Sequence, residues 1–81
     1  MEYNKDKVDE IVLALMYLTT TWNDEYGPRS WKGLDWETLN RLHEKGYIAN
    51  PKSKAKSVAL TEEGAKLSEK LFKKHFSVPA E

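Results

Sequence analysis

Residues 34–64 read LDWETLNRLHEKGYIANPKSKAKSVALTEEG, and this stretch decides the fold. Its pattern predicts a helix, a strand, a turn, a returning strand and a second helix, in that order. Asp35 can accept hydrogen bonds from the free N–H groups of a helix that begins at Trp36. Gly46 can end that helix because glycine readily adopts the left-handed conformation of a C-cap. We therefore expect a mainly α domain with a small β-hairpin, an α+β fold.

The helix predicted over 35–45 is amphipathic. Its apolar positions recur at spacings of three and four residues, and the positions between them are polar or charged. The apolar positions are Trp36, Leu39, Leu42 and His43. One face of this helix should therefore pack against the domain, while the other face meets solvent or a ligand.

A β-hairpin is expected after this helix. Tyr47 and Ile48 would form its first strand, and residues 57–60 would form the returning strand, with a turn favoured by Asn50-Pro51 between them. The connecting loop over 51–57 contains three lysines and no acidic residue; the lysines are Lys52, Lys54 and Lys56. The hairpin is therefore expected to end in a basic wing.

Further helices are expected on both sides of the central stretch. The first would run from a cap at Asn4 to about Thr19, and the last from a cap at Thr61 to about Phe76, followed by a frayed tail over 77–81. The first helix has a main apolar stripe that is expected to face the core, formed by Val8, Ile11, Val12, Leu15 and Leu18. Apolar side chains also lie off this stripe, so the helix should be buried on more than one side.

Two explanations for the second apolar face are open. A second copy of the chain could pack on Leu13, Ala14 and Tyr17, which would then form a dimer interface. Alternatively, the aromatic side chains of the loop over 22–33 could fold back over the helix as a core lid, and these are Trp22, Tyr26 and Trp31. A small chain has few elements with which to cover two faces, which favours the dimer.

Two resemblances rest on these residues. Leu39-x-x-Leu42-x-x-x-Gly46-Tyr47-Ile48, a loop and then Val58-x-Leu60-Thr61-Glu62-Glu63-Gly64 resemble the recognition helix, wing and following helix of bacterial regulators such as the multiple antibiotic resistance regulator family. The segments WKGLDW (31–36), RLHEKG (41–46) and KAKSV (54–58) are similar to an uncharacterised bacterial family of small domains of unknown function, over nearly the whole chain. The first resemblance implies a winged-helix-like fold with three main helices and a two- or three-stranded wing. The second implies no activity.

The loop over 22–33 departs from the winged-helix pattern. A helix-turn-helix has a full second helix before its recognition helix, whereas this loop is interrupted by Gly27-Pro28. A short helical turn or a short strand near residues 30–32 could take its place.

Composition points to a single domain over 1–81, with its core at about 4–76. The chain has no cysteine, which excludes a disulfide framework and a thiolate zinc site. Its polar, acidic start does not have the pattern of a signal peptide, so we expect a cytoplasmic protein. The longest apolar run, 11–18, is far shorter than the ~20 residues that cross a bilayer, so no membrane association is expected.

The net charge of zero conceals an uneven distribution. Residues 1–40 contain four Lys/Arg and eight Asp/Glu, whereas residues 41–81 contain nine and five. A basic wing could approach a polyanion such as double-stranded DNA. By resemblance to winged-helix regulators, the residues that would face bases or backbone are Thr38, Asn40, Arg41 and Lys45, and those that would contact phosphates are Lys52, Lys54 and Lys56. The acidic residues Asp35, Glu37 and Glu44 oppose this because they place negative charge near the duplex.

No convergent set of catalytic side chains is evident in the sequence. His43 and His75 lie on different predicted helices, and the four glycines are too widely spaced for a phosphate-binding loop. We therefore expect a protein that is not an enzyme and has no metal, cofactor or small-molecule ligand. Two functions remain: a DNA-binding module of the transcription-regulator type, or a protein–protein interaction module, as a homodimer or with another partner, that has lost DNA binding.

Overall fold

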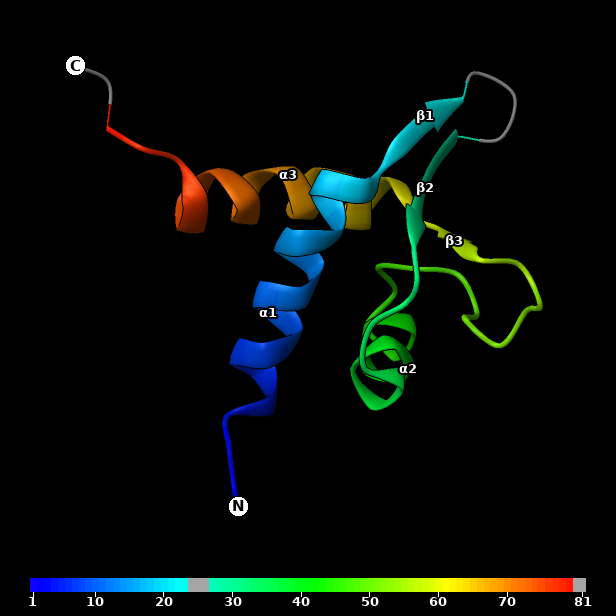
Figure 1. The fold of residues 1–81 in the computed structure, drawn as a ribbon, viewed down its shortest axis with the longest axis horizontal. Coiled ribbons are helices and arrows are strands. Elements are labelled where there is room, and N and C mark those ends of the chain that lie inside the picture. Colours follow the sequence, from blue (N-terminus) through cyan, green and yellow to red (C-terminus); the bar gives the residue numbers. More distant parts are fainter. Residues whose placement is uncertain (24–26, 80–81) are drawn as a thin grey trace.

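The computed structural model describes residues 1–23 and 27–79 and is shown in Figure 1. In chain order its elements are α1 (Lys5–Met16), the 3-10 turn η1 (Tyr17–Thr19), β1 (Thr21–Asn23), β2 (Gly27–Trp31), α2 (Trp36–Glu44), β3 (Ser57–Ala59) and α3 (Glu62–Phe76). Three helices and one three-stranded antiparallel sheet confirm the predicted α+β class, and their order is compatible with the predicted winged-helix-like layout.

Each helix begins at the predicted cap. The side chains of Asn4, Asp35 and Thr61 accept hydrogen bonds from the backbone N–H groups of Lys7, Thr38 and Gly64, respectively. These bonds satisfy donors that have no partner within a helix. Gly46 has a φ of 84°, a conformation that L side chains rarely adopt, and it turns the chain away from α2 as predicted.

The sheet is built differently from the predicted hairpin. Its order is β1-β2-β3, and β2 pairs with β3 through Arg29↔Ala59 and Ser30↔Val58. The predicted pairing of residues 47–48 with 57–60 is reduced to one bridge, Ile48↔Leu60. The main partner of the returning strand therefore comes from the loop over 22–33. This loop supplies a five-residue strand, whereas the segment after Ile48 soon reaches Pro51, which lacks a backbone donor.

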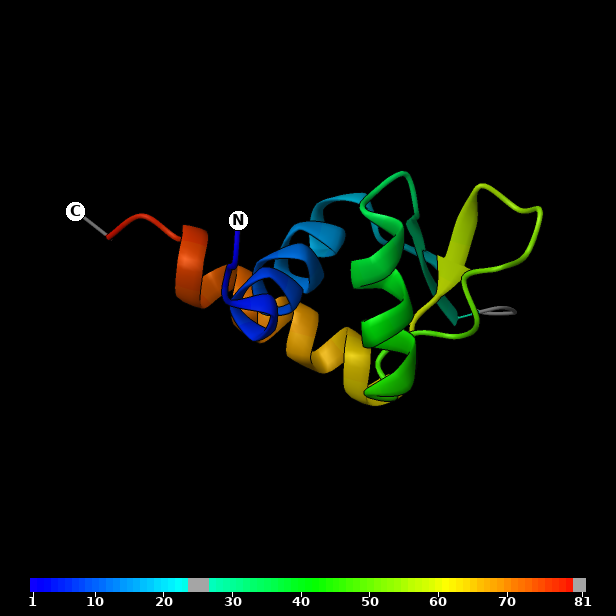
Figure 2. The ribbon, with the colours of Figure 1, turned by 90° about the horizontal axis from the view of Figure 1, so that it is seen from below.

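The core lies where the three helices meet the inner side of the sheet. α3 crosses behind α1, and α2 lies beside α1, as Figures 1 and 2 show. Ser68 of α3 donates a hydrogen bond to the carbonyl of Leu13, with 2.8 Å between Oγ and O. The buried apolar residues are Leu13, Ala14, Met16, Leu39, Leu42, Ile48, Val58, Leu60, Ala65 and Leu71.

The orientation of α1 about its own axis was predicted wrongly. Leu13 and Ala14, expected at a dimer interface, are buried inside the chain, and Tyr17 packs its ring 5.1 Å from that of Phe72. Of the stripe expected in the core, Val12 does pack against it, but Leu15 and Leu18 lie outside, 37% and 66% exposed. An apolar stripe shows that a face can be buried, but on a helix that is apolar nearly all round it does not show which face is buried.

The predicted aromatic lid is also wrong for the residues that the structure describes. Trp22 on β1 is 67% exposed and Trp31 on β2 is 53% exposed; Tyr26 lies outside the described residues. The reason is that this segment extends as strands instead of folding over α1. The predicted short strand near residues 30–32 corresponds to the end of β2.

Candidate nucleic-acid interface

One side of α2 is joined to α1 by an ion-pair cluster that surrounds Asp9. This carboxylate is only 2% exposed. Arg41 approaches it with Nε 2.8 Å and Nη2 2.7 Å from Oδ1, and Nζ of Lys45 lies 2.7 Å from Oδ2. Lys45 also lies 3.1 Å from Asp6, and Nη2 of Arg41 donates to the hydroxyl of Thr38 at 3.1 Å. The cations of α2 therefore compensate a carboxylate that is buried between two helices.

The ionisation of this cluster follows from its geometry. Burial alone would raise the pKa of the Asp9 carboxyl, but hydrogen bonds and positive charge from Arg41 and Lys45 outweigh burial and hold this pKa below its ordinary value. The same hydrogen bonds with Asp9 raise the pKa values of Arg41 and Lys45. All three groups are therefore charged near neutral pH.

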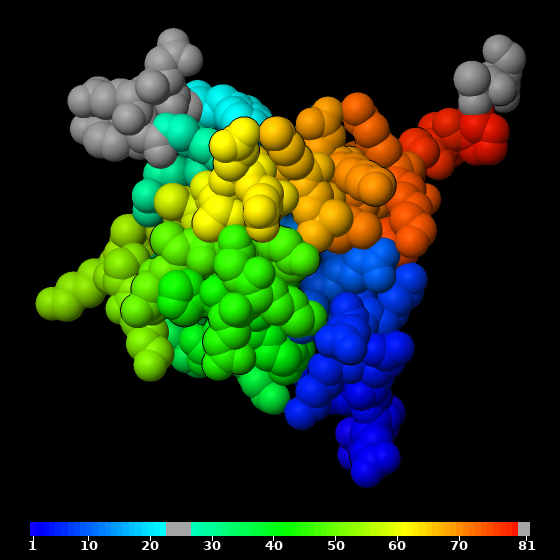
Figure 3. Space-filling view, turned by 180° about the vertical axis from the view of Figure 1, so that it is seen from behind, coloured from blue at the N-terminus to red at the C-terminus, as the bar shows by residue number. Residues whose placement is uncertain are grey.

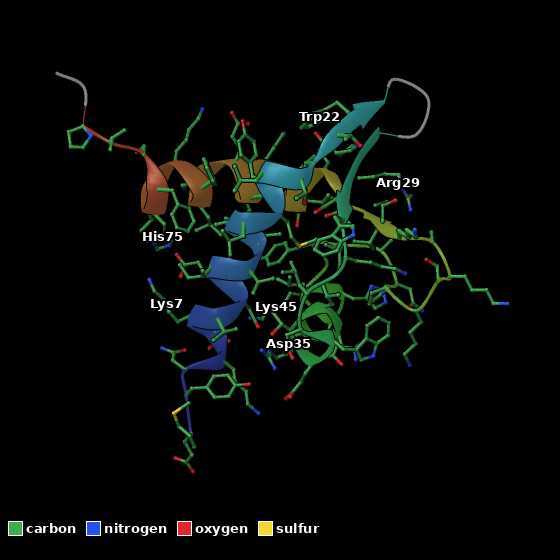
Figure 4. The ribbon with its side chains drawn as sticks, in the orientation of Figure 1. Lys7, Trp22, Arg29, Asp35, Lys45 and His75 are labelled. Atoms are coloured by element: carbon green, nitrogen blue, oxygen red, sulfur yellow. The ribbon has the colours of Figure 1, made fainter. Side chains whose placement is uncertain are left out.

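Three residues predicted to face DNA from α2 have partners within the domain instead. Thr38 is fully buried and donates its hydroxyl hydrogen to Asp35, at 2.7 Å from Oδ2. Arg41 and Lys45 are held by Asp9, and Lys45 lies between α1 and α2 in Figure 4. Their assignment to a DNA-facing surface is corrected for a physical reason: a charged side chain that pairs with a buried carboxylate is not available to a phosphate.

The outer side of α2 has a different character. Asn40, also predicted to contact DNA, is half-buried, while Trp36, His43 and Glu44 on the same helix are exposed. Nδ1 of His43 lies 3.0 Å from the carbonyl oxygen of Ile48, which ties this side of the helix to the start of the wing loop. The outer side therefore presents aromatic and amide groups together with acidic ones, and no arginine or lysine.

The wing loop after Pro51 presents Lys52, Lys54 and Lys56, and all three are exposed. No hydrogen bond or ion pair joins their side chains to residues 1–23 or 27–79. The chain has no Asp or Glu between Lys45 and Thr61. The wing is thus a projecting segment of one charge sign, and it agrees with the sequence prediction.

Two basic residues of the neighbouring β2 region support the wing and were not among the predicted site residues. Nζ of Lys32 donates to the carbonyl of Pro51 at 2.8 Å and to Oγ of Ser53 at 3.0 Å. Arg29, labelled on β2 in Figure 4, donates to Oγ and to the carbonyl of Ser57, both at 2.9 Å. Only the pairing of β2 with β3 brings these cations to the wing, so sequence spacing contains no signal for them.

A hollow of about 320 Å³ opens where the three helices meet. In the view from behind, Figure 3, α1 is seen at the bottom of a depression between α2 and α3. Its lining combines leucines with the charged cluster: Asp6, Asp9, Glu10, Leu13, Leu42, Lys45, Tyr47, Leu67 and Leu71. The carboxylates in it already have partners, since Glu10 lies 3.5 Å from Nζ of Lys74 and 2.8 Å from Nε2 of His75. The hollow therefore presents no charged group that lacks a partner.

Across residues 1–23 and 27–79, no three or more His, Cys, Asp or Glu side chains are grouped so that they could hold a metal ion. Over the same residues, no helix has the length and apolar character that crossing a membrane requires.

Comparison with known proteins identifies relatives of this chain. A family model described as "Domain of unknown function (DUF6429)" matches residues 4–78. The chain is 48% identical over 77 residues to the uncharacterized protein y4hR of Sinorhizobium fredii (strain NBRC 101917 / NGR234), and the match covers 95% of this chain and 99% of that protein. No solved structure matches the chain. The predicted resemblance to an uncharacterised bacterial family is confirmed, and the chain belongs to the DUF6429 family of domains of unknown function.

Proposed function

We propose that this domain binds double-stranded DNA through its wing, as a module of the transcription-regulator type. The observation that carries the proposal is the wing itself, which presents Lys52, Lys54 and Lys56 to solvent on a segment without acidic residues. Exposed lysines on a projecting loop contact phosphates and release condensed counterions, which is the main source of affinity for nucleic acid of any sequence.

The support of the wing loop strengthens this proposal. Hydrogen bonds from Lys32 and Arg29 hold the two ends of the loop, and Lys52 N donates to the side chain of Asn50 at 3.0 Å. A loop that is already ordered loses less conformational entropy when it binds. The supporting cations also add positive charge beneath the three lysines.

The geometry also limits what this interface would recognise. Because Thr38 is bonded to Asp35 and both Arg41 and Lys45 pair with Asp9, only Asn40 remains of the four residues that were expected at the bases or backbone from α2. Phosphate contacts position a protein but do not read sequence. The expected activity is therefore binding with weak sequence preference, and with any direct base contact made from the outer side of α2.

Fluorescence anisotropy with a labelled duplex of mixed sequence tests the proposal. Three lysine–phosphate contacts should make log K fall with log salt at a slope of about −2.7, at ~0.9 per contact, with binding detectable at ~50 mM salt. The variant K52A/K54A/K56A should lose most of this slope.

The matched control is K66A/K70A/K73A, which removes the same charge from the exposed surface of α3. It should leave the slope nearly unchanged. Absence of binding at ~50 mM salt, or an equal loss in both triple variants, would reject the wing as a DNA-binding element.

A further inference from the structure

The outer side of α1 exposes an apolar stripe formed by Val8, Ile11, Leu15 and Leu18, the last of these in η1. Leu15 and Leu18 are 37% and 66% exposed, and Val8 and Ile11 are half-buried. In Figure 2, α3 lies on one side of α1, and no element of residues 1–23 or 27–79 covers the opposite side. Contiguous exposed apolar side chains on a small domain mark an interaction surface.

We propose that two copies of this chain associate through the outer stripes of their α1 helices, packed antiparallel about a two-fold axis. The spacing within the stripe is three, four and three residues, and it reads the same from either end. A reversed second helix therefore meets the first in register, with Val8 opposite Leu18 and Ile11 opposite Leu15. Such self-complementarity is what a two-fold interface requires of one surface patch.

Charge on α1 favours the antiparallel orientation over the parallel one. Lys7 and Lys5 are exposed beside the start of the stripe, and Nζ of Lys5 also lies 3.5 Å from Glu37 of α2, whereas Thr19 and Thr21 flank its end. In a parallel pair, the lysines of both copies would be brought together at one end. In an antiparallel pair they separate, and each set lies near the negative end of the partner's helix dipole.

The size of the stripe predicts how strongly the copies associate. α1 and η1 contain 12 and 3 residues, so the helical surface is only about 22 Å long and ~10 Å wide. That surface is smaller than the ~800 Å² per partner of a standard interface. We therefore expect a reversible dimer with a Kd on the order of 10–100 µM, which dissociates at low concentration.

Sedimentation equilibrium of the full chain from ~1 to ~500 µM tests this inference across the expected Kd. Leu18→Glu should raise the Kd at least about 30-fold, because it buries a charge in an apolar contact. Since Leu18 is exposed in the single copy, circular dichroism should show the variant folded. The matched control is Val78→Glu, which places the same charge at another exposed apolar residue and should leave the Kd unchanged.

Disulfide exchange can report whether the two α1 helices of the dimer are antiparallel or parallel, because the chain has no cysteine of its own. In a mixture of Ile11→Cys and Leu15→Cys chains under a glutathione redox buffer, the antiparallel pair should favour the mixed disulfide over either self-disulfide, because the cysteines then face each other within bonding distance. A parallel pair would favour the self-disulfides and would overturn the orientation.

Three results would overturn the dimer itself. They are a monomer throughout the concentration range, an unchanged Kd in Leu18→Glu, and a monomer that binds vesicles of anionic phospholipid through the same stripe, which would reassign the surface to a membrane. None of these measurements contains DNA, so their failure is distinguishable from failure of the proposed DNA binding.

Discussion

The α1–α2 interface and the wing both contain basic residues that were expected to be exposed, yet the fold places these residues in opposite environments. Arg41 and Lys45 are held by the buried carboxylate of Asp9, whereas Lys52, Lys54 and Lys56 project from a loop without acidic residues. The difference shows that the fold, and not the sequence pattern, decides which lysines and arginines are held in ion pairs with a buried carboxylate. A basic residue on a presumed recognition helix is therefore weak support for DNA contact until its neighbours are known.

The largest expected effect on stability comes from truncating a buried side chain on the inner side of α2, which faces the core. Leu42→Ala should lower the free energy of unfolding by about 2–5 kcal/mol, because a fully buried leucine leaves a cavity behind. Trp36→Ala on the exposed outer side of the same helix should cost much less. Urea denaturation of both variants measures the difference, and equal losses would contradict the assignment of inner and outer sides.

Removing the buried carboxylate should have the next largest effect. Asp9→Asn should lower the free energy of unfolding by about 2–4 kcal/mol, because it leaves two cations beside a buried neutral group. Asp6→Asn, at a side chain that is 90% exposed, should have only a small effect. A chevron or equilibrium denaturation series on both variants would reveal whether the interface depends on Asp9 in particular.

Acid should weaken the same interface selectively. A carboxyl whose pKa is lower in the folded state contributes stability that is present above its unfolded pKa, which is 3.8 for Asp9, and that is lost as the pH falls through the folded value. Stability should therefore decline as the pH falls below about 4. Asp35 and Glu10 also have lowered pKa values, so Asp9→Asn should make the decline shallower without removing it. Thermal melting of the unaltered chain and of Asp9→Asn from pH 6 to pH 2 measures both profiles. Parallel curves would show that Asp9 does not contribute to the loss of stability in acid.

The smallest effect on stability should come from the wing. K52A/K54A/K56A should leave the denaturation midpoint unchanged, because these side chains form no ion pair with residues 1–23 or 27–79. Lys32→Ala should differ, since it removes hydrogen bonds to Pro51 and Ser53 and should increase hydrogen exchange in the loop. A marked loss of stability in the triple variant would show that the wing lysines are structural after all.

Local signals in the sequence predicted the helices well. Asn4, Asp35 and Thr61 were identified as caps because a short polar side chain that precedes an amphipathic segment satisfies the first free N–H groups, wherever that segment later packs. Gly46 ended α2 for an equally local reason. Hydrogen bonds between residues three or four apart require no knowledge of the rest of the chain.

Side-chain environment was predicted less well where it depends on distant partners. Arg41 looked available because Asp9 lies 32 residues earlier in the chain, and their bond exists only after α1 packs on α2. For the same reason, nothing in the loop over 22–33 indicated that its Arg29 would reach Ser57. The exposure of the basic side chains was therefore predicted correctly on the wing, where the residues are close in sequence, and incorrectly for Arg41 of α2.

What the sequence by itself determined is the three helices, their order, their N-caps and the sign of charge on the wing. All of these follow from neighbouring residues, through capping, periodicity and composition. The tertiary structure alone decided which side of α1 is buried, which strand pairs with β3 and which cations are held in ion pairs with the buried carboxylate. Those outcomes depend on contacts between segments far apart in the chain. Burial of the Asp9 carboxylate, for example, is favourable only because Arg41 and Lys45 pair with it.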